Sequence, residues 1–141
     1  MKIRELKTPE EIKNYLDSFE TNYVKVAITD IDGVLRGKYM HVDKFIKSSE
    51  SGFGFCDVIF GWDSNDELYN FKNVGEEDLF TGWHSGFPDV KTAIIPESGR
   101  QNPFEKNIPI FLAELSDAQV CPRGVLKKVL SRLEEEGLRS M

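Results

Sequence analysis

The chain has 141 residues, of which 40% are hydrophobic and 30% charged, and its formal net charge of −6 argues against a nucleic-acid partner, because binding phosphates needs a basic surface. No apolar run is long enough to span a bilayer, and no apolar core of a signal peptide follows the charged N-terminus. The two cysteines, Cys56 and Cys121, belong to no Cys-x-x-Cys pair, so we expect a reducing, cytoplasmic setting.

The first predicted elements are a helix and a strand. Residues 8–11 form a capping box, in which Thr8 is the N-cap, proline takes the first helical position and glutamate the third. This pattern predicts a helix over residues 9–19. Apolar side chains then alternate with others over residues 24–29, which indicates a strand with one face toward the core. The residues expected on that face are Val24, Val26 and Ile28.

A hairpin and further strands come next. The Asp-Gly pair at residues 32–33 is a strong signal for a tight turn, so we predict that residues 34–40 pair back on the first strand. A short helix is expected over residues 42–47, and later strands over 90–95 and 108–115. This order of helices and strands favours an α+β fold with a mixed sheet.

The last helix is predicted to begin at Pro122 and to end near Gly137. One of its faces carries a full apolar stripe, formed by Val125, Leu126, Val129, Leu130 and Leu133. The stripe allows two interpretations: the helix caps the sheet, or it is the first element of a second domain.

Residues 53–62, Phe-Gly-Phe-Cys-Asp-Val-Ile-Phe-Gly-Trp, form the most informative segment of the sequence. The segment is too apolar for a solvated loop and too rich in glycine for a regular strand, so we expect it to bury its side chains against a partner surface. Asp57 is the only acid between Glu50 and Asp63. The acidic and aromatic run over residues 63–89 has no clear period and is too long for a simple connector.

Residues 30–35, Asp-Ile-Asp-Gly-Val-Leu, follow an apolar strand and resemble the first motif of haloacid-dehalogenase-type phosphatases. The resemblance implies that Asp30 is the nucleophile and Asp32 the acid/base, with Mg²⁺ between them. The acidic cluster that should follow is incomplete, since Ser116-Asp117 lacks its second acid. We therefore favour the interpretation in which the Asp-Gly pair forms a turn and Asp30 is a surface acid beside it, with a phosphatase as an alternative.

Four segments follow one another along the chain in an order that matches a known family. They are residues 32–40 with Arg-Gly-Lys, 86–90 with Pro-Asp, the strand 108–114, and 121–130 with Cys-Pro-Arg at a helix start. Together they resemble the N-terminal β-grasp domain of the glutamine synthetase family, over about residues 22–138. The sequence Cys-Asp-Val-Ile-Phe-Gly-Trp resembles that of the glutamine synthetase-like carboxylate–amine ligases more than that of the housekeeping glutamine synthetases.

The resemblance implies a β-grasp-like mixed sheet flanked by an N-terminal and a C-terminal helix. Residues 1–21 would be a helical extension, residues 22–118 the β-grasp domain, and residues 119–141 the first helix of a missing catalytic domain. The chain would then be a fragment of a ligase or a truncated gene product.

The resemblance also implies a function. Enzymes of this family use ATP to phosphorylate the γ-carboxylate of glutamate, and ammonia or an amine then displaces the phosphate. Mg²⁺ or Mn²⁺ organises the phosphates in the C-terminal catalytic domain, so residues 1–141 alone are expected to be inert, without a metal or cofactor site. The β-grasp domain packs on a neighbouring subunit in a ring-shaped homo-oligomer, and one of its loops completes that neighbour's active site.

Carried onto this sequence, the resemblance implies that Asp57 lies at the amine site of the adjacent subunit and that Phe55 and Trp62 contact that subunit. The housekeeping enzymes carry Phe-Asp-Gly-Ser-Ser at this loop, whereas here the acid stands one place later and no serine follows. A larger amine is therefore an alternative to ammonia. Two other interpretations stay open: Asp57 caps a turn or faces solvent, or the chain is a stand-alone β-grasp module that binds a partner through residues 53–62.

Four further charged or titratable residues have simple interpretations. Arg36 and Lys38 share one face of a predicted strand, where they are either solvated charges or contacts to a neighbouring subunit. His41 and His84 lack the spacing of metal ligands, so we expect no metal or base role for them.

Overall fold

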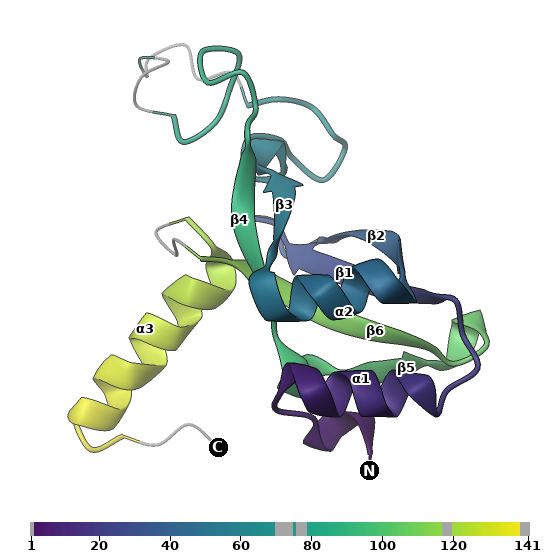
Figure 1. Cartoon of the computed structure of the whole chain (residues 1–141). Coiled ribbons are helices and arrows are strands. Elements are labelled where there is room, and N and C mark those ends of the chain that lie inside the picture. Colours follow the sequence, from purple (N-terminus) through teal and green to yellow (C-terminus); the bar gives the residue numbers. More distant parts are fainter. Residues whose placement is uncertain (1, 70–74, 76–78, 117–119, 139–141) are drawn as a thin grey trace.

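The computed structural model describes residues 2–69, 75, 79–116 and 120–138. Its elements follow one another along the chain as Figure 1 shows. The helices and strands are α1 (Pro9–Asp17), β1 (Tyr23–Thr29), β2 (Leu35–His41), α2 (Val42–Ser51), β3 (Phe53–Cys56), β4 (Asp89–Ile94), β5 (Arg100–Asn102), β6 (Ile108–Leu115) and α3 (Pro122–Glu135). The short 3₁₀ helices are η1 (Ile3–Glu5), η2 (Asp57–Phe60), η4 (Pro96–Ser98) and η5 (Pro103–Glu105).

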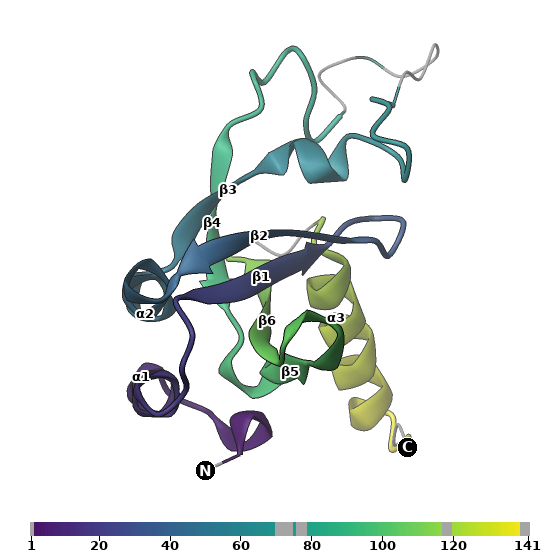
Figure 2. The same ribbon diagram turned by 90° about the vertical axis from the view of Figure 1, so that its right-hand side faces the viewer.

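The described strands form one curled, mixed sheet in the order β2-β1-β6-β4-β3, with β5 paired to β6. β1 and β6 run parallel, and the other pairs are antiparallel. The first hairpin closes with Thr29 opposite Leu35, so the Asp-Gly pair lies in its turn, as predicted. In Figure 2, α1 and α2 lie on one side of the sheet and α3 on the other. The predicted α+β fold with a mixed sheet is therefore confirmed.

The core lies between the sheet and the layer formed by α1 and α2. The three residues of β1 that the alternation places on the core face, Val24, Val26 and Ile28, are at most 1% exposed. Phe45 of α2 packs on Phe111 of β6, with ring centroids 5.0 Å apart. Full burial of an apolar side chain of this size contributes about 1.5–3 kcal/mol. The packing of this layer therefore holds the sheet in place.

The local signals at α1 are confirmed. Thr8 Oγ1 accepts the Glu11 N–H at 3.2 Å, and Glu11 Oε2 accepts the Thr8 N–H at 3.1 Å, which completes the capping box. Hydrogen bonds from backbone amides, that of Lys7 first, hold the pKa of Glu11 below its ordinary value. The helix buries Ile12 and Leu16 and ends at Asp17, slightly before the predicted end.

Residues 53–56 form the regular strand β3, so the expectation of irregular structure at this point is wrong. A Cβ at Gly54 would lie 2.7 Å from a carboxylate oxygen of Asp89 on β4, so glycine leaves room for the Asp89 side chain beside the paired strands. α2 also runs past its predicted end and stops at Gly52, whose φ of 77° suits glycine. β5 was not predicted, because three residues carry no period.

α3 stands away from the sheet (Figure 1), and much of its apolar stripe is exposed. Val125, Leu126 and Val129 are 46%, 58% and 47% exposed. The interpretation in which this stripe caps the sheet is therefore wrong for this structure. Gly137 follows the helix with a φ of 79°, as its predicted end requires. No helix in the described residues is both long and apolar enough to cross a membrane.

Candidate functional site

Asp57 is the first residue of η2, directly after β3, and its side chain is buried. The residue is 4% exposed, so the interpretation in which it faces solvent is wrong. Thr81 Oγ1 donates a hydrogen bond to Asp57 Oδ1 at 2.7 Å, and the Asp57 N–H donates to the Pro88 carbonyl at 3.1 Å. The carboxylate is therefore held in one place by a residue from another part of the chain.

Thr81 reaches Asp57 because Gly61 leaves room for it. A Cβ at Gly61 would lie 2.6 Å from the methyl carbon of Thr81, closer than real side chains approach. Thr81 is itself 4% exposed. Sequence reasoning missed it, since a threonine 24 positions away in an aperiodic run gives no signal of contact with Asp57.

No described residue forms an ion pair with Asp57, and one hydroxyl is the hydrogen-bond donor that the structure gives its carboxylate. A buried carboxylate with few protein donors keeps capacity to accept hydrogen bonds from a ligand. Attraction to a cation is also stronger there than in water, because the local dielectric is lower.

Thr81 also lines a cavity of about 330 Å³, to which Asp57 itself does not contribute. Phe60 and Phe80 contribute to its wall and pack edge to face, with ring centroids 6.2 Å apart. Ile31 and Tyr69 complete a mainly apolar lining. This composition suits a small hydrocarbon group rather than a second charge.

Phe55 and Trp62 stand on either side of η2 and are half-buried against the core of their own domain. Phe55 packs edge to face on Phe53, with centroids 6.2 Å apart. The Trp62 ring lies 5.4 Å from the guanidinium carbon of Arg36. Their expected contact with an adjacent subunit stays a prediction, as does the role of Asp57.

Arg36 is not a freely solvated charge, so that interpretation is wrong for it, whereas Lys38 is exposed. The side chain of Arg36 is 16% exposed and pairs with Asp30 at 2.8 Å and with Asp66. The hydrogen bond to Asp30 is the main cause that raises the pKa of Arg36. Lys38 Nζ lies 4.9 Å from the centroid of the Phe55 ring.

Asp30 is fully buried, which corrects the expectation of a surface acid. Its Oδ1 accepts the N–H groups of Asp32 and Val34 at 3.0 and 2.8 Å, and its Oδ2 accepts Arg36 Nε–H at 2.8 Å. Both oxygens are therefore committed to the turn and to Arg36. A nucleophilic carboxylate needs an oxygen free to attack phosphorus, so this geometry argues against the phosphatase alternative.

The described residues do not fit a metal site. They contain no group of three or more His, Cys, Asp or Glu side chains that could hold an ion. His41 instead serves as the N-cap of α2, where its Nδ1 accepts the Asp43 N–H at 3.3 Å.

No protein-family model matches the chain. Among curated proteins, type-1 glutamine synthetase 2 of Dictyostelium discoideum is 41% identical over 129 residues, which cover 88% of this chain and 24% of that protein. Glutamate–isopropylamine ligase of a Pseudomonas species is 28% identical over 137 residues, 92% of this chain and 28% of that protein.

A solved structure, the Plasmodium falciparum glutamine synthetase, superposes with a TM-score of 0.62 at 20% identity, covering 97% of this chain and 24% of that one. The chain thus spans about a quarter of the length of the relatives it matches. The sequence identity to the Dictyostelium protein and the shared fold lead to one conclusion. The chain is homologous to the N-terminal part of glutamine synthetases and related glutamate ligases.

Proposed function

We propose that this chain is the N-terminal region of an ATP-dependent ligase that joins glutamate to ammonia or an amine. Residues 53–62 would complete the amine site of a neighbouring subunit in a ring-shaped homo-oligomer. The homology to the N-terminal part of this family supports the proposal. The relatives' names include an isopropylamine ligase and a γ-glutamylputrescine synthetase, so the amine differs among them.

The buried carboxylate of Asp57 carries this proposal. An amine reaches the active site as an ammonium ion, which must be bound, desolvated and deprotonated before it can attack. A carboxylate that is 4% exposed and fixed by Thr81 can accept charge-assisted hydrogen bonds from such a cation. The apolar cavity that Thr81 lines favours an amine with a short hydrocarbon substituent over ammonia.

The remaining machinery would belong to a catalytic region beyond this segment. The described residues offer no cluster for Mg²⁺ or Mn²⁺, so ATP and metal would bind elsewhere and residues 1–141 alone would be inert. Residues 1–21 would form an extension, residues 22–118 the β-grasp domain and residues 119–141 the first helix of the catalytic domain. The uncovered stripe of α3 supports this division, because an apolar helix face of that size is a natural packing surface.

A chimera tests the proposal. In this chimera, residues 1–141 replace the matching N-terminal part of the Dictyostelium relative, with which they share 41% identity. We expect glutamate-dependent ATP turnover and a γ-glutamyl amide product when ammonia or a short alkylamine is supplied, and none from residues 1–141 alone. A chimera that assembles into the oligomer of the relative but turns over no amine would contradict the proposed function. Turnover by the isolated chain would contradict its inert role.

A further inference from the structure

Lys38 connects the two outer edges of the sheet. β2 and β3 stand at opposite ends of the strand order and share no backbone ladder. From β2, Lys38 Nζ lies 5.2 and 4.9 Å from the ring centroids of Phe53 and Phe55, and 3.5 Å from the Gly54 carbonyl oxygen. A cation is attracted to aromatic faces at this distance. β2 therefore holds the beginning of residues 53–62.

Arg36 holds the other end of the same segment. Its guanidinium carbon lies 5.4 Å from the centroid of the Trp62 ring. Its Nη2 donates to the Asp63 carbonyl at 2.9 Å, and its Nη1 pairs with the Asp66 carboxylate. A planar guanidinium can make these contacts together, because its five N–H donors point in fixed directions. We call these two sets of contacts the clasp: those of Lys38 with Phe53, Gly54 and Phe55, and those of Arg36 with Trp62, Asp63 and Asp66.

The clasp is anchored in the interior of the β1–β2 turn. Arg36 Nε donates at 2.8 Å to Asp30, which is fully buried and is itself fixed by the amides of Asp32 and Val34. Charges that are shielded from solvent are screened only weakly by salt. The turn thus sets the place of the Arg36 guanidinium, and the guanidinium sets the place of the residues that it binds.

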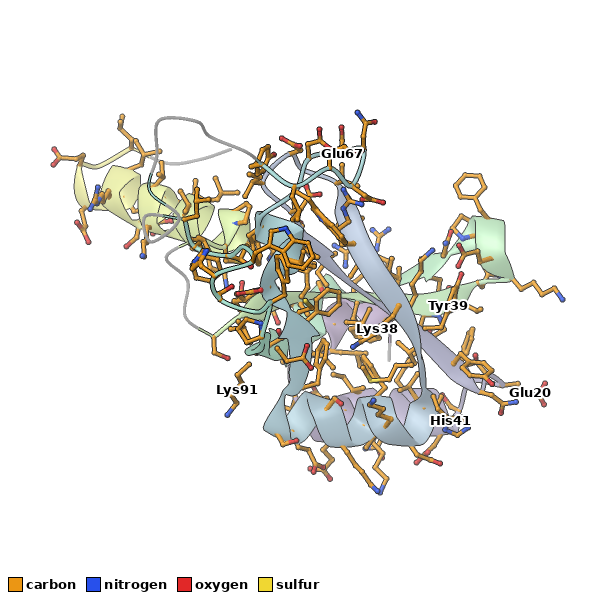
Figure 3. All side chains as sticks on the ribbon, turned by 90° about the horizontal axis from the view of Figure 1, so that it is seen from above. Glu20, Lys38, Tyr39, His41, Glu67 and Lys91 are labelled. Atoms are coloured by element: carbon orange, nitrogen blue, oxygen red, sulfur yellow. The ribbon has the colours of Figure 1, made fainter. Side chains whose placement is uncertain are left out.

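The residues that the clasp contacts come directly before and after η2 in the sequence, and Asp57 is the first residue of that helix. Figure 3 shows Lys38 and Tyr39 on opposite sides of β2, so that Lys38 is the one directed toward β3, and it labels Glu67 in the turn that follows Trp62. We propose that Arg36 is a positioning residue for the amine site: through the clasp it fixes where the Asp57 carboxylate lies. The inference rests on the proposed function of Asp57.

Hydrogen exchange of the 141-residue chain tests the clasp directly. The reporters are the amides of Gly61, Asp63 and Tyr69, which bond to carbonyls within residues 57–69. Arg36→Lys keeps a cation beside Asp30 but loses the fork that reaches the later residues. We expect these amides to exchange roughly 10-fold faster in that variant, while amides of β1 and β6 change little.

A matched control removes a similar contact elsewhere. Lys25 pairs with Glu105 at 2.7 Å and lies 5.4 Å from the Tyr39 ring centroid, so Lys25→Met deletes an ion pair and a cation–π contact outside the clasp. We expect Lys25→Met to leave the three reporters unchanged. Unchanged reporters in Arg36→Lys, or equal acceleration in β1 and β6, would overturn the proposal.

A second variant covers the case in which Arg36→Lys does not fold. The Asp66 side chain is 60% exposed, and Asp66→Asn leaves the buried Asp30–Arg36 pair intact. We expect about 3-fold faster exchange at the same reporters, because one of the bonds of the clasp is weakened. Reporter rates equal to those of the unmutated chain would count against the clasp.

The chimera then links the clasp to the amine. Arg36→Lys should raise KM for the amine roughly 5- to 10-fold with KM for glutamate unchanged, because a displaced carboxylate affects one substrate. Equal changes in both values would mean that Arg36 has a general structural role and would overturn the proposal. A chimera that is inactive before mutation would instead refute the proposed function, and the exchange experiment would still decide whether the clasp exists.

Discussion

Asp30 and Asp57 are both buried acids in short irregular segments, yet their surroundings differ. Asp30 accepts two backbone N–H groups and an arginine, so both of its oxygens are bound by its own chain. Asp57 accepts one hydroxyl, from Thr81, and no described residue forms an ion pair with it. A fully satisfied carboxylate stabilises the fold, whereas one with remaining capacity can bind a ligand. The contrast therefore separates a structural acid from a functional candidate.

The largest effect is expected at Asp30. Asp30→Asn removes the charge that neutralises Arg36 and places an amide against its Nε–H. Breaking a buried ion pair from one side typically costs about 3–5 kcal/mol, so the free energy of unfolding should fall by that amount. Urea unfolding followed by circular dichroism measures the change. A loss below about 1 kcal/mol, the usual value for an exposed pair, would show that Asp30 is not the anchor described.

A smaller effect is expected at Thr81. Thr81→Val keeps the shape of the side chain but removes the donor to a buried carboxylate, which typically costs about 1.5–3 kcal/mol. Thr92→Val is the matched control, because Thr92 is equally buried but its hydroxyl donates to the neutral Val90 carbonyl at 3.1 Å. Thr81→Val should therefore lower the free energy of unfolding more than Thr92→Val does. Equal losses would mean that the hydrogen bond from Thr81 to the Asp57 carboxylate is no stronger than the one from Thr92 to a neutral carbonyl.

The smallest effect is expected at Glu105, an acid whose ion pair is near the surface. Hydrogen bonds from Lys25, then Tyr39, hold the pKa of Glu105 below its ordinary value. A carboxyl whose pKa is lowered by folding stabilises the fold above its unfolded pKa, about 4.3, and this contribution is lost as the pH falls through the lower folded value.

Glu105→Gln should therefore lower the urea midpoint slightly at about pH 7, and the difference from the unmutated chain should shrink below about pH 4. Unfolding curves at several pH values measure this difference. A difference that grows as the pH falls would have the wrong sign for a lowered pKa.

The sequence alone predicts those parts of the fold that depend on neighbours along the chain. The capping box at Thr8, the alternation in β1 and the Asp-Gly turn are local patterns, and the structure contains all three. The pairing of β3 with β4 was missed, because Gly54 weakens the strand pattern while Asp89, which it accommodates, lies far along the chain. Local periodicity carries no information on such long-range fits.

For the candidate site, too, the sequence predicted one part and missed another. Asp57 stood out as the lone acid in an apolar segment, a feature visible in the sequence. Thr81 did not, and the contacts of Arg36 within its own chain were not foreseen, because a hydrogen bond across 24 residues and a clasp between opposite sheet edges arise only from the tertiary fold. Burial of Asp30 was likewise invisible, since turns usually lie on the surface and the arginine that pairs with Asp30 comes from the next strand.

The most direct test of the account is the amine kinetics of Asp57→Asn in the chimera, beside the exposed control Asp43→Asn, whose side chain is 81% exposed. We expect kcat/KM for the amine to fall roughly 10- to 100-fold, equivalent to about 1.4–2.8 kcal/mol, because the amide removes one charge-assisted contact. KM for ATP and the oligomer should stay unchanged, and Asp43→Asn should match the unmutated chimera. Unaltered amine kinetics in Asp57→Asn would contradict the account, because Asp57 would then be a buried turn residue with no role in binding the amine.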